Sequence, residues 1–341
     1  MKERILALTA AVATVVSVGA AGPAHATPTG ESATATVFYP NPVQALGLQS
    51  LVDAKDADSP AFAAAYRQVT LTDLDGTGKL SGRYVVVKSS TGKAALAVDG
   101  AFPAWHRDAD QFEQVMAYYW VTTAQRYLQH LGFGSALRPV NQRRIEVRID
   151  QYGGDNSFFR EDKANITLGK GGVDDAEDAE VIVHEYGHSV QDGQVPGFGT
   201  TLESGAIGEA FGDYLAVAVS SWATGAPART PEACVADWDS VSYTSTVPHC
   251  LRRLDGTKHY PESVVGEVHA DGEIWSRALW DIRAALGDTR ASTLIVEAQF
   301  AFAVDTTFAA AAQATVDAAQ RLYGTQAAQA TRAAFVARGL L

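Results

Sequence analysis

The pattern H-E-x-x-H occurs in this chain as His184-Glu185-Tyr186-Gly187-His188, directly after the apolar residues 181–183. An apolar approach of this kind is typical of a buried helix. Positions four residues apart share a helix face, so His184 and His188 are expected to point both imidazoles at one metal ion. Glu185 lies about 100° around the same helix, beside the ion but not bound to it. The alternative is two histidines that merely share a helix face, so the prediction depends on the segments that follow.

Residues 203–214 read ESGAIGEAFGDY and predict a second helix, because their apolar residues recur at three- and four-residue steps. A catalytic zinc ion takes three protein ligands and keeps a fourth position for water. Glu209 is the expected third ligand. Asp213, one turn later, is expected to accept the second N–H of His184. A solvated helix face is the competing interpretation, and the surrounding Gly, Ala and Ile residues disfavour it.

A further histidine signal lies at His269, within the segment GEVHADGEIW of residues 266–275. The apolar residues that follow it predict a helix. A histidine at the start of a helix is well placed to reach into a cleft. Without the first motif, a capping or surface histidine would be the better interpretation.

Taken in this order, the three segments resemble the thermolysin-like zinc metallopeptidases, the group that binds zinc through a glutamate as well as two histidines. Thermolysin carries H-E-x-x-H, then E-S-G-A-I-N-E-A-x-x-D, then a G-V-H segment. The sequences HEYGH at 184–188 and VHADGEIW at 268–275 are closer to those of the fungalysin family than to those of thermolysin. The resemblance covers roughly residues 145–285 and rests on three separate motifs.

By this resemblance His184, His188 and Glu209 would be the zinc ligands, Glu185 the catalytic base and His269 a stabiliser of the oxyanion. The resemblance also implies a set of supporting residues: the outer carboxylates Glu203 and Asp213, and the substrate-binding residues Asn156, Ser157 and Arg252. Arg253 is the alternative to Arg252.

Zinc is therefore the expected cofactor, whereas calcium stays open without a motif that supports it. No acidic residue occurs between Asp213 and Glu232, where thermolysin draws ligands for its paired calcium ions. The acidic run 174–178 fits the first turn of the zinc helix, where negative charge is favoured. We interpret this run as a helix start rather than as a calcium site.

The expected fold class is α+β, with the two-lobed architecture of the thermolysin-like enzymes. A mixed sheet region comes first, a mainly helical lobe comes last, and the active-site helix lies between them. The expected organisation is a signal peptide at 1–26, a β-rich region at 27–105, a zinc-binding lobe at 106–224 and a helical lobe at 225–341.

Within the first half, residues 69–74 and 83–88 predict two strands, and the turn DGTG at 75–78 predicts that they form a hairpin. Residues 144–149 alternate as a half-buried strand does. Residues 109–131 predict a long helix whose many aromatic side chains belong to the core.

The first 26 residues have a basic start, an apolar stretch and an A-x-A site at 24–26, the pattern of a secretory signal. A retained membrane anchor is the alternative. The net charge of −12 argues against nucleic-acid binding. Expected partners are protein or peptide substrates, with no stable membrane association after signal removal, and the chain is expected to be a monomer.

The two cysteines, Cys234 and Cys250, lie between the zinc helices and His269. In an exported protein they predict a disulfide. It would close a loop of about 15 residues, worth roughly 3 kcal/mol on the chain-entropy model. A zinc site is the alternative, and His249 alone does not complete one.

The leading functional hypothesis is a secreted zinc endopeptidase that uses Glu185 as general base. A zinc exopeptidase of the aminopeptidase type is the second hypothesis, although no motif for anchoring a free amine is found. The third is a non-catalytic secreted binding module on a peptidase fold. The presence of both Glu185 and His269 disfavours it, because a metal-stabilised scaffold needs neither.

Overall fold

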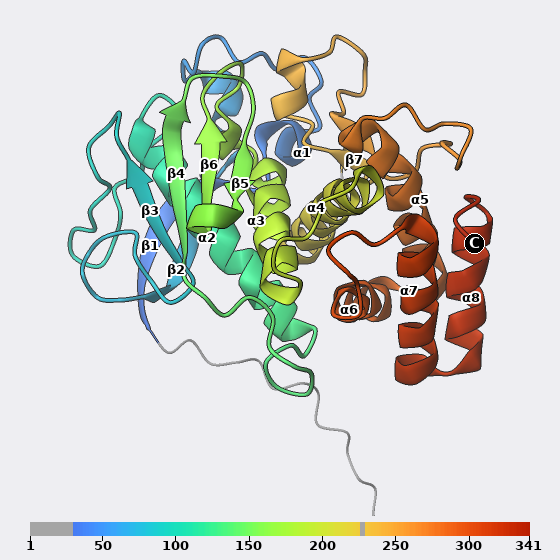
Figure 1. The fold of residues 1–341 in the computed structure, drawn as a ribbon. Coiled ribbons are helices and arrows are strands. Elements are labelled where there is room, and N and C mark those ends of the chain that lie inside the picture. Colours follow the sequence, from blue (N-terminus) through green and yellow to red (C-terminus); the bar gives the residue numbers. More distant parts are fainter. Residues whose placement is uncertain (1–29, 226–228) are drawn as a thin grey trace, which may run out of the picture.

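The structure is a computed structural model that describes residues 30–225 and 229–341. The signal sequence expected at 1–26 lies outside the described residues. Strands gather in the N-terminal half and helices in the C-terminal half. The helices α3 (Ala179–Gln194) and α4 (Leu202–Thr224) lie between them (Figure 1). The fold class is therefore α+β, as predicted.

The two strands of the predicted hairpin form, but they enter different sheets. β2 (Tyr66–Leu74) pairs antiparallel with β1 (Glu31–Phe38), whereas β3 (Val85–Ser89) joins a second sheet. An isolated bridge joins Leu74 to Gly82. The predicted hairpin is therefore wrong, because β1, which lies far earlier in the chain, supplies the partner for β2.

The second sheet has the strand order β3-β4-β6-β5. β4 (Ile145–Tyr152) alternates between buried and half-buried residues over most of its length, as predicted, and β6 (Asn165–Gly169) runs parallel to it. β5 (Phe158–Arg160) runs antiparallel to β6 at the edge of the sheet. An edge strand keeps backbone N–H and C=O groups that can pair with another extended chain.

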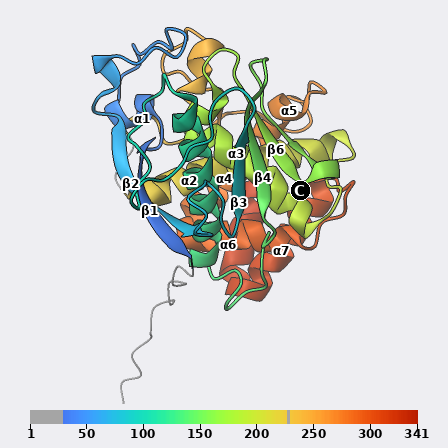
Figure 2. The same ribbon diagram turned by 90° about the vertical axis from the view of Figure 1, so that its left-hand side faces the viewer.

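The long aromatic helix is α2 (Asp110–His130), and it packs between this sheet and α3 (Figure 2). Its aromatic side chains belong to the core, as predicted, and those with an exposed fraction below 4% are Phe112, Tyr118, Trp120 and Tyr127. The short elements are α1 (Pro42–Leu46), η1 (Pro60–Phe62), η2 (Glu161–Lys163), η3 (Asp175–Glu177) and η4 (Asp239–Ser242).

The C-terminal part is helical from Val268 onward. Its helices are α5 (Val268–Leu286), α6 (Asp288–Gln299), α7 (Phe308–Tyr323) and α8 (Thr325–Val336). Residues 229–267 are irregular apart from η4 and the two-residue strands β7 (Cys234–Val235) and β8 (Arg252–Arg253). None of the described helices combines the length and apolar character that a membrane span requires.

α3 and α4 approach each other closely because glycine occupies the point of contact on both helices. A methyl group at Gly187 would lie 3.0 Å from the Cα atom of Gly212. A methyl group at Gly212 would lie 2.7 Å from Nδ1 of His184. Close packing of backbones tolerates no side chain at such positions. The two glycines therefore set the distance between the helices that carry the expected metal ligands.

The predicted disulfide between Cys234 and Cys250 is present. It closes the irregular segment in which β7 pairs with β8, and Cys234 is buried. This segment brings Arg252 toward α4, so the disulfide restrains a part of the chain that helps to build the site.

The variant with both Cys234→Ser and Cys250→Ser should lose roughly 3 kcal/mol of unfolding free energy, because the cross-link no longer restricts the unfolded chain. Urea unfolding followed by tryptophan fluorescence measures the change. The reduced wild-type protein is the matched control and should unfold at the same urea concentration as the variant. An unfolding midpoint equal to that of the oxidised wild type would contradict the stabilising role.

Candidate active site

His184 and His188 on α3 converge with Glu209 on α4. Nε2 of His184 lies 3.1 Å from Oε2 of Glu209, and Nε2 of His188 lies 3.6 Å from Oε1. One ligand atom from each residue lies within 4.8 Å of the others. Burial lowers the pKa of His188 to about 4, so its ring is neutral and able to bind a metal. Two imidazoles and one carboxylate are a donor set of catalytic zinc, so the residues present fit this ion.

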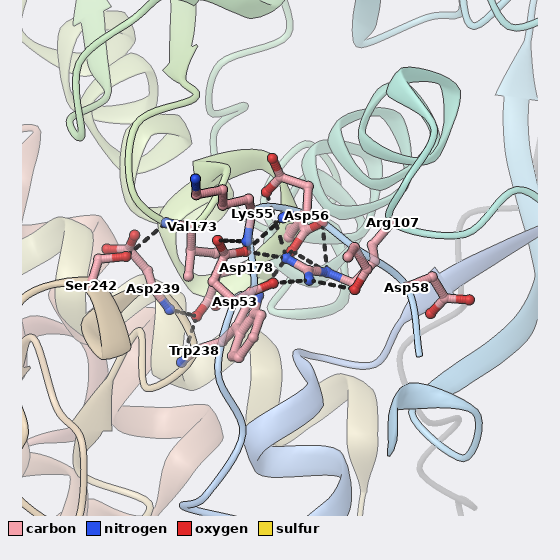
Figure 3. Close-up of polar contacts among 12 residues, drawn as sticks. Asp53, Lys55, Asp56, Asp58, Arg107, Val173, Asp178, Trp238, Asp239 and Ser242 are labelled. Carbon is pink, nitrogen blue, oxygen red and sulfur yellow. Dashed lines mark hydrogen bonds and ion pairs between the residues drawn. The ribbon is translucent and has the colours of Figure 1, made fainter. Parts of the chain in front are cut away.

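The acidic run 174–178 does more than begin the zinc helix. Asp178 caps α3 by accepting the backbone N–H of Glu180 at 2.9 Å. Glu177 is buried and pairs with the guanidinium of Arg107 at 2.8 Å. Figure 3 shows Asp178 and Arg107 within one network of polar contacts. The helix start was predicted correctly, and the long-range pairing with Arg107 was not visible in the sequence.

Behind His184 the structure places a carboxylate and then a guanidinium. Nδ1 of His184 lies 2.8 Å from Oδ1 of Asp213. Arg252 donates to both oxygens of Asp213, from Nε and from Nη2, each at 2.7 Å. Burial alone would lower the pKa of His184, but its contacts with Asp213 and Glu209 outweigh burial and raise the pKa to about 10. The same carboxylates that attract a proton here would stabilise a metal cation.

Glu185 is buried beside the ligands, with 6% of its surface exposed. Its Oε2 atom is buried and has no hydrogen-bond partner among the described residues. Burial raises the pKa of Glu185 to about 7. The charges of Glu209 and Asp175 also raise this pKa, whereas the charge of His184 lowers it. A carboxylate with a pKa near neutrality can accept a proton and release it again.

His269, in the first turn of α5, also contacts Glu209. Its Nε2 atom lies 3.2 Å from Oε2 of Glu209, and its Nδ1 atom lies 2.6 Å from Oε1 of Glu267. Glu267 also caps α5 by accepting the N–H of Ala270 at 2.8 Å. The sequence interpretation missed Glu267, although an acid directly before a helix start is a capping signal. Glu267 orients the half-exposed ring of His269.

A cleft of about 370 Å³ lies over these residues. Asn156 and Ser157 line it from the loop before β5, as expected of residues that meet a substrate. Arg252 lines it as well, whereas the alternative Arg253 pairs with Asp255 at 2.7 Å. Of the two arginines, Arg252 is therefore the one that the structure brings to the cleft.

Glu203 does not join this group. Its Oε2 atom accepts the backbone N–H of Phe308 at the start of α7, and its Oε1 atom accepts the hydroxyl of Tyr260 at 3.3 Å. Glu203 therefore ties α4 to α7 rather than serving as an outer carboxylate of the histidines. A residue six positions before Glu209 lies more than one helical turn away from it, which explains the difference.

The cleft-wall residues that were not found from the sequence include Tyr243, Asp175 and Asp239. They come from η3 and from the irregular segment around η4. Asp175 belongs to the acidic run 174–178, but nothing in the sequence of this run indicated that Asp175 faces a cleft. Tyr243 and Asp239 belong to no local pattern.

The C-terminal part of the chain matches a known family. Residues 197–340 match the family model described as the thermolysin metallopeptidase, alpha-helical domain. This part of the chain is therefore similar to the helical domain of the thermolysin-like metallopeptidases. The matched region includes Glu209, Asp213 and His269 but begins after the two histidines of α3.

One solved structure agrees with this resemblance at the level of the fold. The precursor of protealysin, a metalloproteinase from Serratia proteamaculans, has a TM-score of 0.54 and 16% identity, covering 75% of this chain and 87% of that one. An M1 zinc metallopeptidase mutant from Deinococcus radiodurans has a TM-score of 0.44 and 14% identity, covering 89% and 63%. No match was found among curated proteins. The narrower assignment to the fungalysin branch stays a prediction.

The variant Gly212→Ala should bind zinc roughly tenfold or more weakly, because the added methyl group displaces the ring of His184. Gly208→Ala on the same helix is the matched control. Its methyl group would meet the flexible end of Gln191 at 3.1 Å and the ring of His188 only at 3.9 Å. Competition with a chromophoric chelator measures both affinities. Equal zinc affinity in the two variants would contradict this account of the helix contact.

Proposed function

We propose that the chain is a secreted zinc-dependent endopeptidase whose zinc ligands are His184, His188 and Glu209. The family match supports a metallopeptidase. The observation that carries the proposal is the convergence of these three side chains in the cleft, with the unpartnered carboxylate of Glu185 beside them. A buried oxygen without a partner lowers stability, so its presence in a cleft points to a chemical role.

Zinc held by His184, His188 and Glu209 would supply a Lewis acid that lowers the pKa of a water molecule toward about 7. Glu185 takes the proton from the attacking water and delivers it to the leaving amine. Glu267 holds Nδ1 of His269, so Nε2 of the ring would donate to the carbonyl oxygen as negative charge develops there. Asp213 and Arg252 keep the ring of His184 in place.

The edge strand β5 favours cleavage within a chain. An extended peptide can pair with the open side of β5, so its backbone is held without a charged terminus. Asn156 and Ser157, just before this strand, would contact that backbone. Arg252 uses Nε and Nη2 for Asp213, and Nη1 is the nitrogen left for a substrate carbonyl.

Secretion is supported by two independent features. Residues 1–26 have the composition of a signal peptide. The disulfide between Cys234 and Cys250 is of a kind that forms and persists in oxidising compartments.

The variant Glu185→Gln should retain zinc but lose on the order of 10²- to 10⁴-fold in kcat, because the amide cannot accept the proton of water. Elemental analysis measures the zinc content, and hydrolysis of an unstructured protein such as casein measures the activity. Near-normal turnover by the zinc-loaded variant would remove Glu185 from the mechanism.

A peptide blocked by acetylation at its N-terminus and amidation at its C-terminus should be cleaved internally, because the proposed contacts bind backbone rather than termini. Mass spectrometry of the products locates the cleaved bond. Chelation should abolish cleavage and added zinc should restore it. If single residues are released, and only from unblocked peptides, the result would support the exopeptidase instead. If neither the blocked nor the unblocked peptide is cleaved, the result would support a binding module.

A further inference from the structure

A hollow of about 400 Å³ adjoins the proposed substrate cleft and shares the side chain of Tyr243 with it. Its walls come from two segments that are distant in the chain. Residues 49–52 follow α1, and residues 241–245, together with His249, begin in η4. In Figures 1 and 2, the light orange turn of η4 lies beside the blue loop that follows α1. Because one side chain lines both spaces, a peptide bound in the cleft can continue into the hollow.

The hollow differs from the cleft in charge. The cleft wall includes Glu161, Asp175 and Asp239, whereas no aspartate, glutamate, lysine or arginine is among the described residues that line the hollow. Two of its large hydrophobic side chains are open to solvent, because Val52 is 67% exposed and Tyr243 is 50% exposed. In a chain of net charge −12, an uncharged recess with exposed apolar side chains suits an apolar group rather than an ion.

The two segments that line the hollow are joined to each other. The backbone N–H of His249 donates to Oε1 of Gln49 at 2.7 Å. Nε2 of the His249 ring lies 2.9 Å from the carbonyl oxygen of Gln49, and Nδ1 lies 3.1 Å from the carbonyl oxygen of Thr244. The next residue, Cys250, is fixed by the disulfide to Cys234. A recess built in this way exists before a ligand arrives, so filling it costs little conformational freedom.

Strand β5 sets the direction in which a substrate would reach the hollow. Tyr243 donates its hydroxyl to the carbonyl of Asp155, just before β5, at 2.6 Å, whereas Glu161 lines the cleft just after β5. The hollow therefore adjoins the N-terminal end of this strand. Antiparallel pairs of strands outnumber parallel ones. A peptide that pairs antiparallel with β5 would direct its C-terminal residues toward that end.

We propose that this hollow binds an apolar side chain of the substrate, on the C-terminal side of the scissile bond and beyond the residues that fill the cleft. The inference rests on the proposed endopeptidase function, because the peptide must first lie along β5. Val52 and Tyr243 supply the apolar surface. Partial burial of a leucine side chain against them should tighten binding roughly tenfold. The enzyme would then favour long, unfolded substrates with an apolar residue at this position.

The test compares two series of end-blocked peptides that share one cleaved bond. Each peptide extends the previous one by a single residue on the C-terminal side, and the added residue is either leucine or asparagine, which are similar in size. At the position that reaches the hollow, leucine should lower KM roughly tenfold relative to asparagine and change kcat little, because the contact is the same in the ground state and the transition state. The same extensions on the N-terminal side should show no such preference.

The variant Val52→Asp should lose this preference, because it places a charge in the hollow. The ratio of kcat/KM between the leucine and asparagine peptides should fall from roughly tenfold to about one. Val98→Asp is the matched control, because Val98 is 61% exposed and does not line the hollow, and it should keep the ratio. Three results would overturn the proposal: equal KM values at every C-terminal position, a preference confined to N-terminal extensions, or an unchanged ratio in Val52→Asp.

A binding measurement separates this proposal from the endopeptidase function on which it rests. Fluorescence anisotropy of labelled peptides on zinc-loaded Glu185→Gln measures affinity without cleavage. If the wild-type protein cleaves the shortest peptide but shows no leucine preference in the long ones, the hollow is overturned and the endopeptidase stands. If no peptide is cleaved, the endopeptidase fails. Roughly tenfold tighter binding of the leucine peptide would then still support the hollow, and equal binding would overturn it.

Discussion

The site depends on how closely α3 approaches α4, and Gly187 and Gly212 set that distance. Their contact leaves space for the ring of His184 and no space for a methyl group beside it. Glu209 and Asp213 lie on α4, on either side of this ring. A wider separation of the helices would move both carboxylates away from the imidazole. One backbone contact therefore fixes the ligand geometry and the support behind it.

The buried charges of the site form an alternating row. Glu209 and Asp213 flank His184, and Arg252 lies behind Asp213 with two hydrogen bonds. Removing such groups from water is unfavourable, and only mutual contact offsets it. The row thus positions the imidazole at the expense of stability. A cation bound by the ligands would offset part of this loss, because metal binding contributes to folding free energy.

The sequence predicted the features that follow from helical periodicity. It did not predict contacts between residues that are far apart in the chain. The spacing of His184 and His188 and the helix containing Glu209 needed only local patterns. The pairing of Arg252 with Asp213 joins residues 39 positions apart, and no local pattern encodes it. The hairpin after β2 failed for the same reason, because a turn motif does not reveal that β1 is the stronger partner. Glu203 was misplaced because the family motif gives its position but not its contacts.

Donor chemistry decides which ion the three ligands would select, and nearby charge acts on the carboxylate beside them. Two imidazoles and one carboxylate are a donor set that suits a zinc-like ion. The charge of Asp175 is among the causes that raise the pKa of Glu185. Burial acts in the same direction, so the pKa of Glu185 rises to about 7. A carboxylate with a pKa near neutrality can accept and release a proton, so burial and like charge together give this side chain the property that a general base needs.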